Sequence, residues 1–201
     1  TVRLITIFYT IVGTVMSLTV MSMFSYVIAL KHFPARRFLT WMMFFTMLFS
    51  GGMVPSYILV MNILDLGNTF WALWLPGAMS AFNMIIIKNY FQGLPNELEE
   101  AAIIDGSNDL ITFVRIILPL STASLATFGL FYAVGLWNTY MSALLYIPDN
   151  AKWPIQVLLR QIVYVSSSIG DDSEITSEVA LLSQSIKMAV ILVATVPIVC
   201  V

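Results

Sequence analysis

The sequence predicts an all-α integral membrane protein, and three observations lead to that fold class. Apolar residues make up 59% of the 201 residues and charged residues only 10%, too few to cover a globule in water. The charges also lie far apart, so that they leave five apolar windows near or above the ~20 residues that a helix needs to cross hydrocarbon. Because lipid offers the backbone no hydrogen-bond partner, we expect these windows to be helical.

The five windows define the expected membrane spans in chain order. They are residues 3–31, 37–65, 65–88, 115–149 and 178–201. The third window contains Pro76, the fourth is long enough to tilt, kink or extend past the membrane, and the fifth contains Lys187. A lysine at mid-bilayer costs ~2.5–3.5 kcal/mol on insertion scales, and we expect Lys187 to have a structural role rather than a role in solute contact.

The short basic loop between the first two windows sets the expected orientation. Residues 31–37 carry four Lys, Arg or His side chains in the order Lys31, His32, Arg36, Arg37, which is typical of a cytoplasmic loop. Alternation then places residues 91–115 in the cytoplasm and residues 149–178 outside. In the outer stretch, a proline followed by apolar residues at helical spacing predicts a helix over 153–164, and residues 166–172 are expected to form a mobile loop.

A compact charged segment lies between the third and fourth windows. Pro95 suits the first turn of a helix, the carboxylates of Glu97, Glu99 and Glu100 favour its N-terminal end, and Gly106 is placed to end it. The expected helix has ~11 residues and is marginal by itself, which favours docking to a soluble partner; packing against its own protein alone is the alternative. A second helix is expected to begin at Ser107 or Asn108 and run into the fourth window.

The spacing within this segment resembles the signature loop of permease subunits of ATP-binding-cassette (ABC) importers. Glu100-Ala101-Ala102 is followed after three residues by Gly106, and after nine more residues by Ile116-x-Leu118-Pro119. In that family the loop forms a coupling helix that docks into a cleft on the ATPase subunit. The resemblance implies that ATPase contacts are made by Leu98, Glu100, Ala101, Ala102, Ile104, Asp105 and Gly106.

Further motifs resemble the carbohydrate-uptake group of these importers, in particular its maltose-system G-type permease and the oligosaccharide permeases. They are Met53-Val54-Pro55, Leu66-Gly67-Asn68-Thr69, Leu75-Pro76, Leu94-Pro95 and Trp137-Asn138. The resemblance implies a type I importer domain over 1–201, with a coupling loop over 91–115 and an external loop over 149–178. The group has six spans, so we expect a first span ahead of Thr1 and a cytoplasmic tail.

The resemblance also implies the partners. They are a second, distinct permease subunit, two ATPase subunits that bind ATP and magnesium, an external solute-binding protein and the lipid of the cell membrane. The chain has no phosphate loop of the G-x-x-x-x-G-K-[ST] type, so we expect no cofactor on it and no enzymatic activity. Its few basic residues form no patch for nucleic acid.

Polar and aromatic side chains inside the windows are candidates for the solute pathway. Aromatic faces pack on sugar rings, and amides or hydroxyls bind sugar hydroxyl groups. The alternative is packing between helices with a hydrogen bond worth on the order of 1 kcal/mol. The candidates are Ser80, Asn83, Trp137, Asn138 and Tyr140.

Other functions are less consistent with the composition. A secondary transporter is expected to hold acids inside its spans, and a membrane-embedded enzyme needs titratable groups around a cavity; the windows hold almost none. No His, Cys and carboxylate residues have the spacing of metal ligands. An importer of amino acid, peptide or phosphate remains the alternative within the same class.

Overall fold

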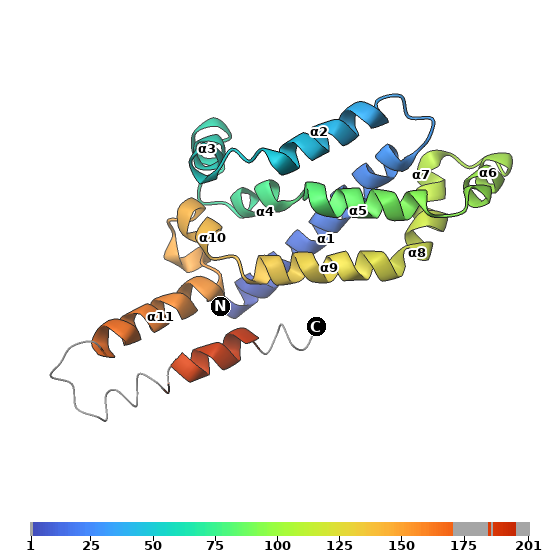
Figure 1. Ribbon diagram of the computed structural model, residues 1–201. Helices are drawn as coiled ribbons and strands as arrows, with labels where there is room; N and C mark the ends of the chain where they lie inside the picture. Colours follow the sequence, from blue (N-terminus) through green and yellow to red (C-terminus); the bar gives the residue numbers. More distant parts are fainter. Residues whose placement is uncertain (1, 171–184, 186, 196–201) are drawn as a thin grey trace.

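A computed structural model of the chain describes residues 2–170, 185 and 187–195. Over these residues the protein is helical and contains no strand (Figure 1). The elements are α1 (Val2–Ala29), α2 (Arg36–Leu48), α3 (Met53–Ile58), η1 (Leu59–Ile63), α4 (Trp71–Gly77), α5 (Ala81–Gln92), α6 (Asn96–Ile104), α7 (Asp109–Thr112), η2 (Phe113–Ile117), α8 (Leu118–Leu120), α9 (Thr122–Trp137), α10 (Met141–Tyr146), η3 (Asn150–Lys152) and α11 (Ile155–Gly170).

Helix α1 is the centre of the bundle. It packs most extensively against α9 and α5, and α2 covers the far side of α5 (Figure 1). Its buried positions include Thr6, Ser17, Ser22 and Ser25, small residues that allow close approach of membrane helices. Gly13 is the tightest point, since a Cβ there would lie 2.7 Å from the Trp74 indole nitrogen.

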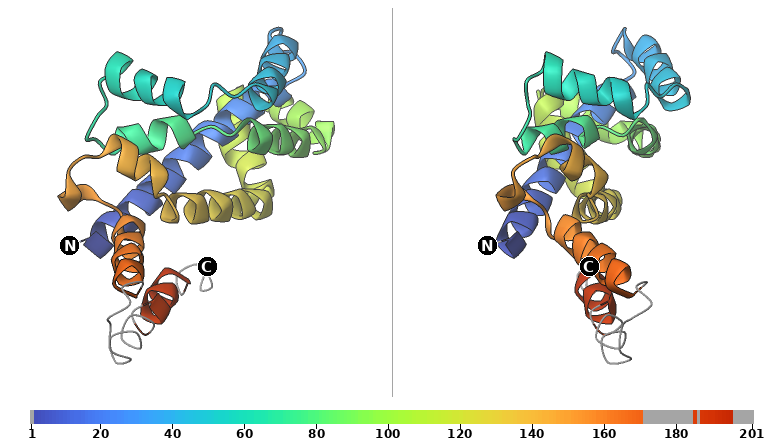
Figure 2. Two further views of the ribbon diagram at one scale, coloured as in Figure 1. Left: turned by 60° about the vertical axis from the view of Figure 1, so that its left-hand side comes forward. Right: turned by 90° about the vertical axis from the view of Figure 1, so that its left-hand side faces the viewer.

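Two apolar clusters lie at opposite ends of α1. The first joins the C-terminal half of α1 to α5, η2 and α9, and includes Tyr26, Phe91 and Phe113. The second joins the N-terminal half of α1 to α4, α10 and the start of α11, and includes Tyr9 and Trp74. Figure 2 shows α6 to α8 at the first end of the bundle and α10 and α11 at the second; we call these the α6 end and the α10 end.

Three of the predicted spans are broken. The second window bends by 116° between α2 and the α3–η1 segment, next to Gly52 with its positive φ of 83°. The third is divided into α4, which contains Pro76, and α5, which Ser80 caps. The fourth bends by 82° where α8 meets α9. The helix predicted to begin at Ser107 or Asn108 and to run into this window is present over Asp109–Leu120, and the bend follows it.

The bend in the fourth window lies close to a proline that disturbs the local helix. Pro119 lacks an N–H, and its ring crowds the carbonyl four residues earlier. The chain responds with a π-helical turn, η2, directly before the proline. The helix then restarts after Ser121, whose own N–H still donates to the Ile117 carbonyl at 3.0 Å.

In the part of the chain that the structure describes, one to three of the five expected spans meet the length and composition of a membrane helix. In the described part of the chain, Leu4–Ala29 is long and apolar enough to cross a membrane by itself, and two bent pairs qualify if each is one span. The pairs are Arg36–Leu48 with Met53–Ile63, and Asp109–Leu120 with Thr122–Trp137. Most of the fifth window lies outside the described residues, although Lys187 is described there and is half-buried.

Helix α11 begins where the sequence predicts and ends later. Its start is tied to α1, because the Ile155 N–H donates to the Thr6 hydroxyl at 2.9 Å, directly after the buried Pro154. The helix continues to Gly170, so the prediction of a mobile loop over 166–170 is wrong, while residues 171 and 172 lie outside the described residues. A serine costs a helix well under 1 kcal/mol, which is too little to end it.

Candidate functional site

Helix α6 has the local structure that its sequence predicts. Pro95 occupies the N-cap, and Glu97 and Glu99 lie in the first turn. At the other end, Gly106 has a φ of 78°, and its N–H donates to the Ile103 carbonyl at 3.0 Å while that of Ser107 donates to the Ala102 carbonyl at 2.9 Å. This pair of bonds is a Schellman motif, in which a left-handed glycine satisfies the last carbonyls of the helix.

The exposed face of α6 combines apolar and acidic side chains. Ile103 is 58% exposed and Ile104 is 85% exposed, and Glu100 and Asp105 are also exposed. Ala102, by contrast, is buried at 3%, so its side chain faces the protein itself. A face of this composition on a short helix is suited to a partner with an apolar cleft and basic or amide groups around it.

The predicted coupling residues therefore divide into two groups. Glu100, Ala101, Ile104, Asp105 and Gly106 are exposed and accessible to a partner, whereas Leu98 is half-buried and Ala102 is buried. Their contact with an ATPase stays a prediction. Ala102 is placed to hold α6 against its own bundle.

The next segment anchors this loop to the bundle. The Asn108 side chain caps α7 by accepting from the Ile111 N–H at 2.9 Å, in agreement with the predicted start at Ser107 or Asn108. Thr112, Phe113 and Ile117 are then buried. The exposed side chains of His32 and Asp109 approach to 3.2 Å, but such an exposed pair contributes little stability.

Tyr26 of α1 is the main contact point beneath the loop. Its ring stacks on Phe113 with the ring centres 4.9 Å apart and meets the edge of Phe91 at 6.2 Å. One aromatic side chain thus joins α1, α5 and η2. Its hydroxyl oxygen is buried and has no hydrogen-bond partner among the described residues.

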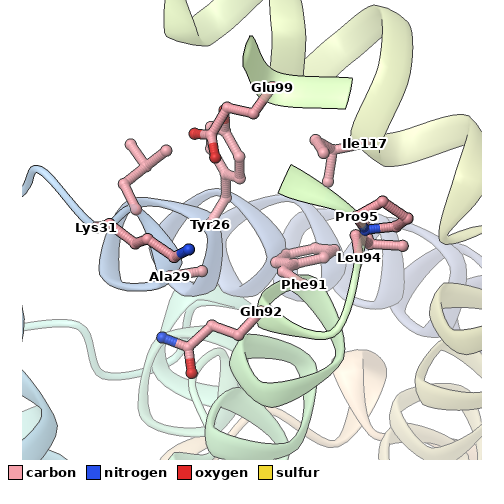
Figure 3. A pocket seen from close by; sticks show the side chains of 10 residues that line it. Tyr26, Ala29, Lys31, Phe91, Gln92, Leu94, Pro95, Glu99 and Ile117 are labelled. Carbon is pink, nitrogen blue, oxygen red and sulfur yellow. The ribbon is translucent and has the colours of Figure 1, made fainter. Parts of the chain in front are cut away.

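A cavity of about 40 Å³ lies between Tyr26 and α6 (Figure 3). Figure 3 shows the Glu99 carboxylate and the Tyr26 ring on one side of it, with Lys31 from the turn after α1 and Gln92 from the end of α5 also lining it. Leu94 and Pro95 form the wall where the chain leaves α5. The base of α6 therefore packs loosely on its polar side and tightly on its aromatic side.

The candidate pathway residues lie at two levels of the bundle. Ser80 caps α5 by accepting from the Asn83 N–H at 3.5 Å, and its own N–H donates to the Tyr132 hydroxyl at 3.3 Å. Trp137 ends α9, five residues after Tyr132 or about 7.5 Å further along the helix. Ser80 and Asn83 are thus brought together, but nearer the middle of the bundle than Trp137.

Beyond α9, two polar side chains are already engaged. The Asn138 amide donates to the Val134 carbonyl at 2.9 Å and caps the helix. The Tyr140 ring is covered by the guanidinium of Arg160, whose central carbon lies 4.6 Å from the ring centre. Arg160 is a residue that sequence reasoning missed, because the sequence does not reveal that α11 folds back over Tyr140.

Comparison with known proteins identifies the family. A family model described as a binding-protein-dependent transport system inner membrane component matches residues 8–201. The chain belongs to this family. It is a permease of an ABC importer, and the ATPase activity lies in a separate subunit.

Individual relatives support this assignment. The permease is 53% identical to the polygalacturonan/rhamnogalacturonan transport system permease protein YtcP of Bacillus subtilis (strain 168), over 97% of this chain and 68% of that protein. It is 48% identical to protein LplC of the same organism, over 96% of this chain and 65% of that protein. The chain thus spans about two thirds of the length of these two relatives.

A solved structure has the same fold. It is the crystal structure of a bacterial ABC transporter involved in the import of the acidic polysaccharide alginate. The match has a TM-score of 0.85 and 30% sequence identity, and covers 99% of this chain and 71% of that chain. The all-helical arrangement of the permease is therefore that of an ABC importer membrane subunit.

Proposed function

We propose that the permease carries oligosaccharides inward across the cell membrane, driven by an ATPase that docks on α6. The observation that carries the docking is the exposed face of α6, where Ile104 is 85% exposed beside Glu100 and Asp105. An isolated helix of nine residues is marginal in water. Here its Ala102 side chain is buried against the protein, while Ile103 and Ile104 stay exposed.

The proposed sugar cargo is supported by the relatives. YtcP is named for polygalacturonan and rhamnogalacturonan, and the solved transporter imports alginate. In this chain Ser80, Asn83, Trp137, Asn138 and Tyr140 are the proposed contacts of the pathway. Ser80 and Asn138 already serve as helix caps. A sugar would therefore bind only to the side-chain donors and acceptors that the caps leave unused.

The proposed assembly follows that of binding-protein-dependent importers. It contains this permease, a second and distinct permease subunit, two ATPase subunits that bind ATP and magnesium, and an external solute-binding protein. The α6 end faces the cytoplasm in this proposal, and the α10 end, with residues 149–178, receives cargo from the binding protein. The basic residues 31–37 next to the α6 end support this orientation.

Uptake into proteoliposomes tests this proposal. The complex is purified through a tag on the permease, and accumulation of labelled trigalacturonate is measured with the binding protein, with and without internal ATP. The proposal expects uptake that needs ATP and no proton or sodium gradient. Gradient-driven uptake without ATP would refute it, and uptake of an amino acid, a peptide or phosphate in place of any oligosaccharide would refute the cargo alone.

A further inference from the structure

The pairing of Arg160 with Tyr140 places a cation at a fixed position at the α10 end. Arg160 lies on α11 and Tyr140 is the N-cap residue of α10, 20 positions earlier in the chain. The guanidinium carbon is 4.6 Å from the ring centre, within the ~6 Å range of a cation–π interaction. The interaction holds a flexible side chain in one place while the residue as a whole stays exposed.

The guanidinium charge has no acidic partner in the described part of the chain. The ion pair that occurs there, between His32 and Asp109, is at the α6 end. Asp149, the described carboxylate nearest in sequence to Arg160, is used locally and accepts from the Ala151 N–H at 3.0 Å. Lys152 donates to the Asn68 carbonyl at 3.0 Å. Arg160 is therefore a positioned cation whose charge no described carboxylate neutralises.

The geometry of the pair leaves the guanidinium able to bind an anion. Stacking on an aromatic ring uses the flat face of the group, whereas its N–H donors point outward from the edge. Two parallel N–H donors match the two oxygens of a carboxylate. One turn earlier on α11, the Gln156 amide nitrogen is also a buried donor without a partner in the described residues.

We propose that Arg160, held by Tyr140, is a recognition site for the carboxylate of an acidic sugar, so that the permease selects uronate-containing oligosaccharides over neutral ones. The proposal rests on the oligosaccharide function proposed above. A uronate carries a carboxylate on the sugar ring, which the guanidinium edge binds in a bidentate manner. A neutral sugar lacks that acceptor, and its passage would leave the guanidinium N–H donors unpaired where water is displaced.

Uptake of one sugar in two charge states tests the proposal. Proteoliposomes that contain the complete transporter and its binding protein are given labelled trigalacturonate or its fully methyl-esterified form, which is neutral and nearly the same size. We expect Arg160→Gln to lower uptake of the acid at least about tenfold at subsaturating concentration, the scale of losing a charged hydrogen bond. We expect uptake of the ester to stay within about twofold, because the ester makes no bidentate contact.

Two further variants sharpen the result. Arg160→Lys keeps the charge but loses the planar fork, so its effect on the acid should be intermediate. Lys152→Gln removes a second cation of the same outer region, which is bonded to a backbone carbonyl and does not stack on a ring, and should leave the acid-to-ester ratio unchanged. ATP turnover without sugar, equal in all variants, reports that each complex is intact.

The possible outcomes separate this inference from the function on which it rests. Equal losses for acid and ester in Arg160→Gln would assign Arg160 a structural role and overturn the inference, as would uptake of both sugars unaffected by the substitution. In either case the oligosaccharide function would stand. If the unaltered transporter imported neither sugar under ATP but imported another class of solute, both proposals would fall.

Discussion

Tyr26 offers a prediction in which the structure separates the effect of a ring from that of a hydroxyl group. The side chain is 6% exposed and lies where α1, α5 and η2 meet, with ring centres 4.9 Å from Phe113 and 6.2 Å from Phe91. Its hydroxyl oxygen is buried and has no hydrogen-bond partner among the residues that the structure describes. Removing the ring and removing the oxygen should therefore have opposite effects on the free energy of unfolding.

The expected magnitudes follow from these contacts. Tyr26→Ala deletes a buried aromatic ring, which costs about 3–5 kcal/mol, of which each ring pair supplies about 0.5–1.5 kcal/mol. Tyr26→Phe keeps both ring contacts and removes an unpaired hydroxyl, whose burial costs about 1–3 kcal/mol. The phenylalanine variant should thus be as stable as the original protein or more stable.

Unfolding by SDS titration in mixed micelles, followed by circular dichroism, gives the two free-energy differences. The alanine variant should unfold at a lower SDS fraction, and the phenylalanine variant at the same or a higher one. If Tyr26→Phe lowered the unfolding free energy by more than about 1 kcal/mol, the scale of one hydrogen bond, the reasoning would be refuted. The hydroxyl would then have a hydrogen-bond partner in the adjacent cavity of about 40 Å³. If Tyr26→Ala left the SDS midpoint of unfolding unchanged, the ring would not stabilise the contact between α1, α5 and η2.

Two glycines give further predictions. At Gly13 even a Cβ would lie 2.7 Å from the Trp74 indole nitrogen, and that nitrogen donates a hydrogen bond to the Tyr9 carbonyl at 3.1 Å. Gly13→Val should therefore lower the unfolding free energy by about 1–3 kcal/mol through overpacking. An unchanged SDS midpoint would contradict the tight packing of α1 on α4. At Gly106 the surroundings are open but φ is 78°. Gly106→Val should therefore lower the unfolding free energy by about 1–2 kcal/mol through backbone strain and speed amide hydrogen exchange in the last turn of α6. Unchanged exchange would contradict the left-handed end of α6. Gly77→Val is the matched control for both, because Gly77 has open space and no positive φ. It should change the unfolding free energy by well under 1 kcal/mol, since valine and glycine differ little in helix propensity.

The α6 loop is the part of the fold that the sequence predicts best. Glu97 and Glu99 in the first turn, Gly106 at the end and Asn108 as the next cap are confirmed, whereas Pro95 is the N-cap residue, one position before the first turn predicted for it. Each of these signals acts through the backbone of residues at most a few positions away. Local sequence therefore contains enough information to place the helix.

The helix breaks and the facing of side chains depend on information that local sequence lacks. The 82° bend after α8 requires Pro119 and the packing of η2 against Tyr26, and residue spacing alone does not decide between a kink and a straight helix. Ala102 fits the helix equally well on either face, and only the bundle shows that it is buried. The pairing of Arg160 with Tyr140 joins two helices through a turn whose path the sequence does not specify.

The sequence predicts which residue types could line a solute pathway, among them Tyr140, and their contact with a sugar stays a prediction. Their arrangement is not predictable from the sequence. The structure adds that the Tyr140 ring is covered by a guanidinium and that Ser80 and Asn138 already cap helices. Which groups remain available to a solute is a property of packing between distant segments.

The transfer of energy from an ATPase through α6 is the central claim, and the ratio of sugar imported to ATP hydrolysed tests it most directly. Glu100→Lys reverses a charge on the exposed face of α6 without touching the buried contacts of Ala102 or Tyr26. The account predicts a variant that inserts in the membrane with its partner permease but imports roughly tenfold less sugar or worse, since a reversed charge at an interface repels the partner or leaves its groups unpaired. Uptake and ATP turnover equal to those of the original protein would contradict it.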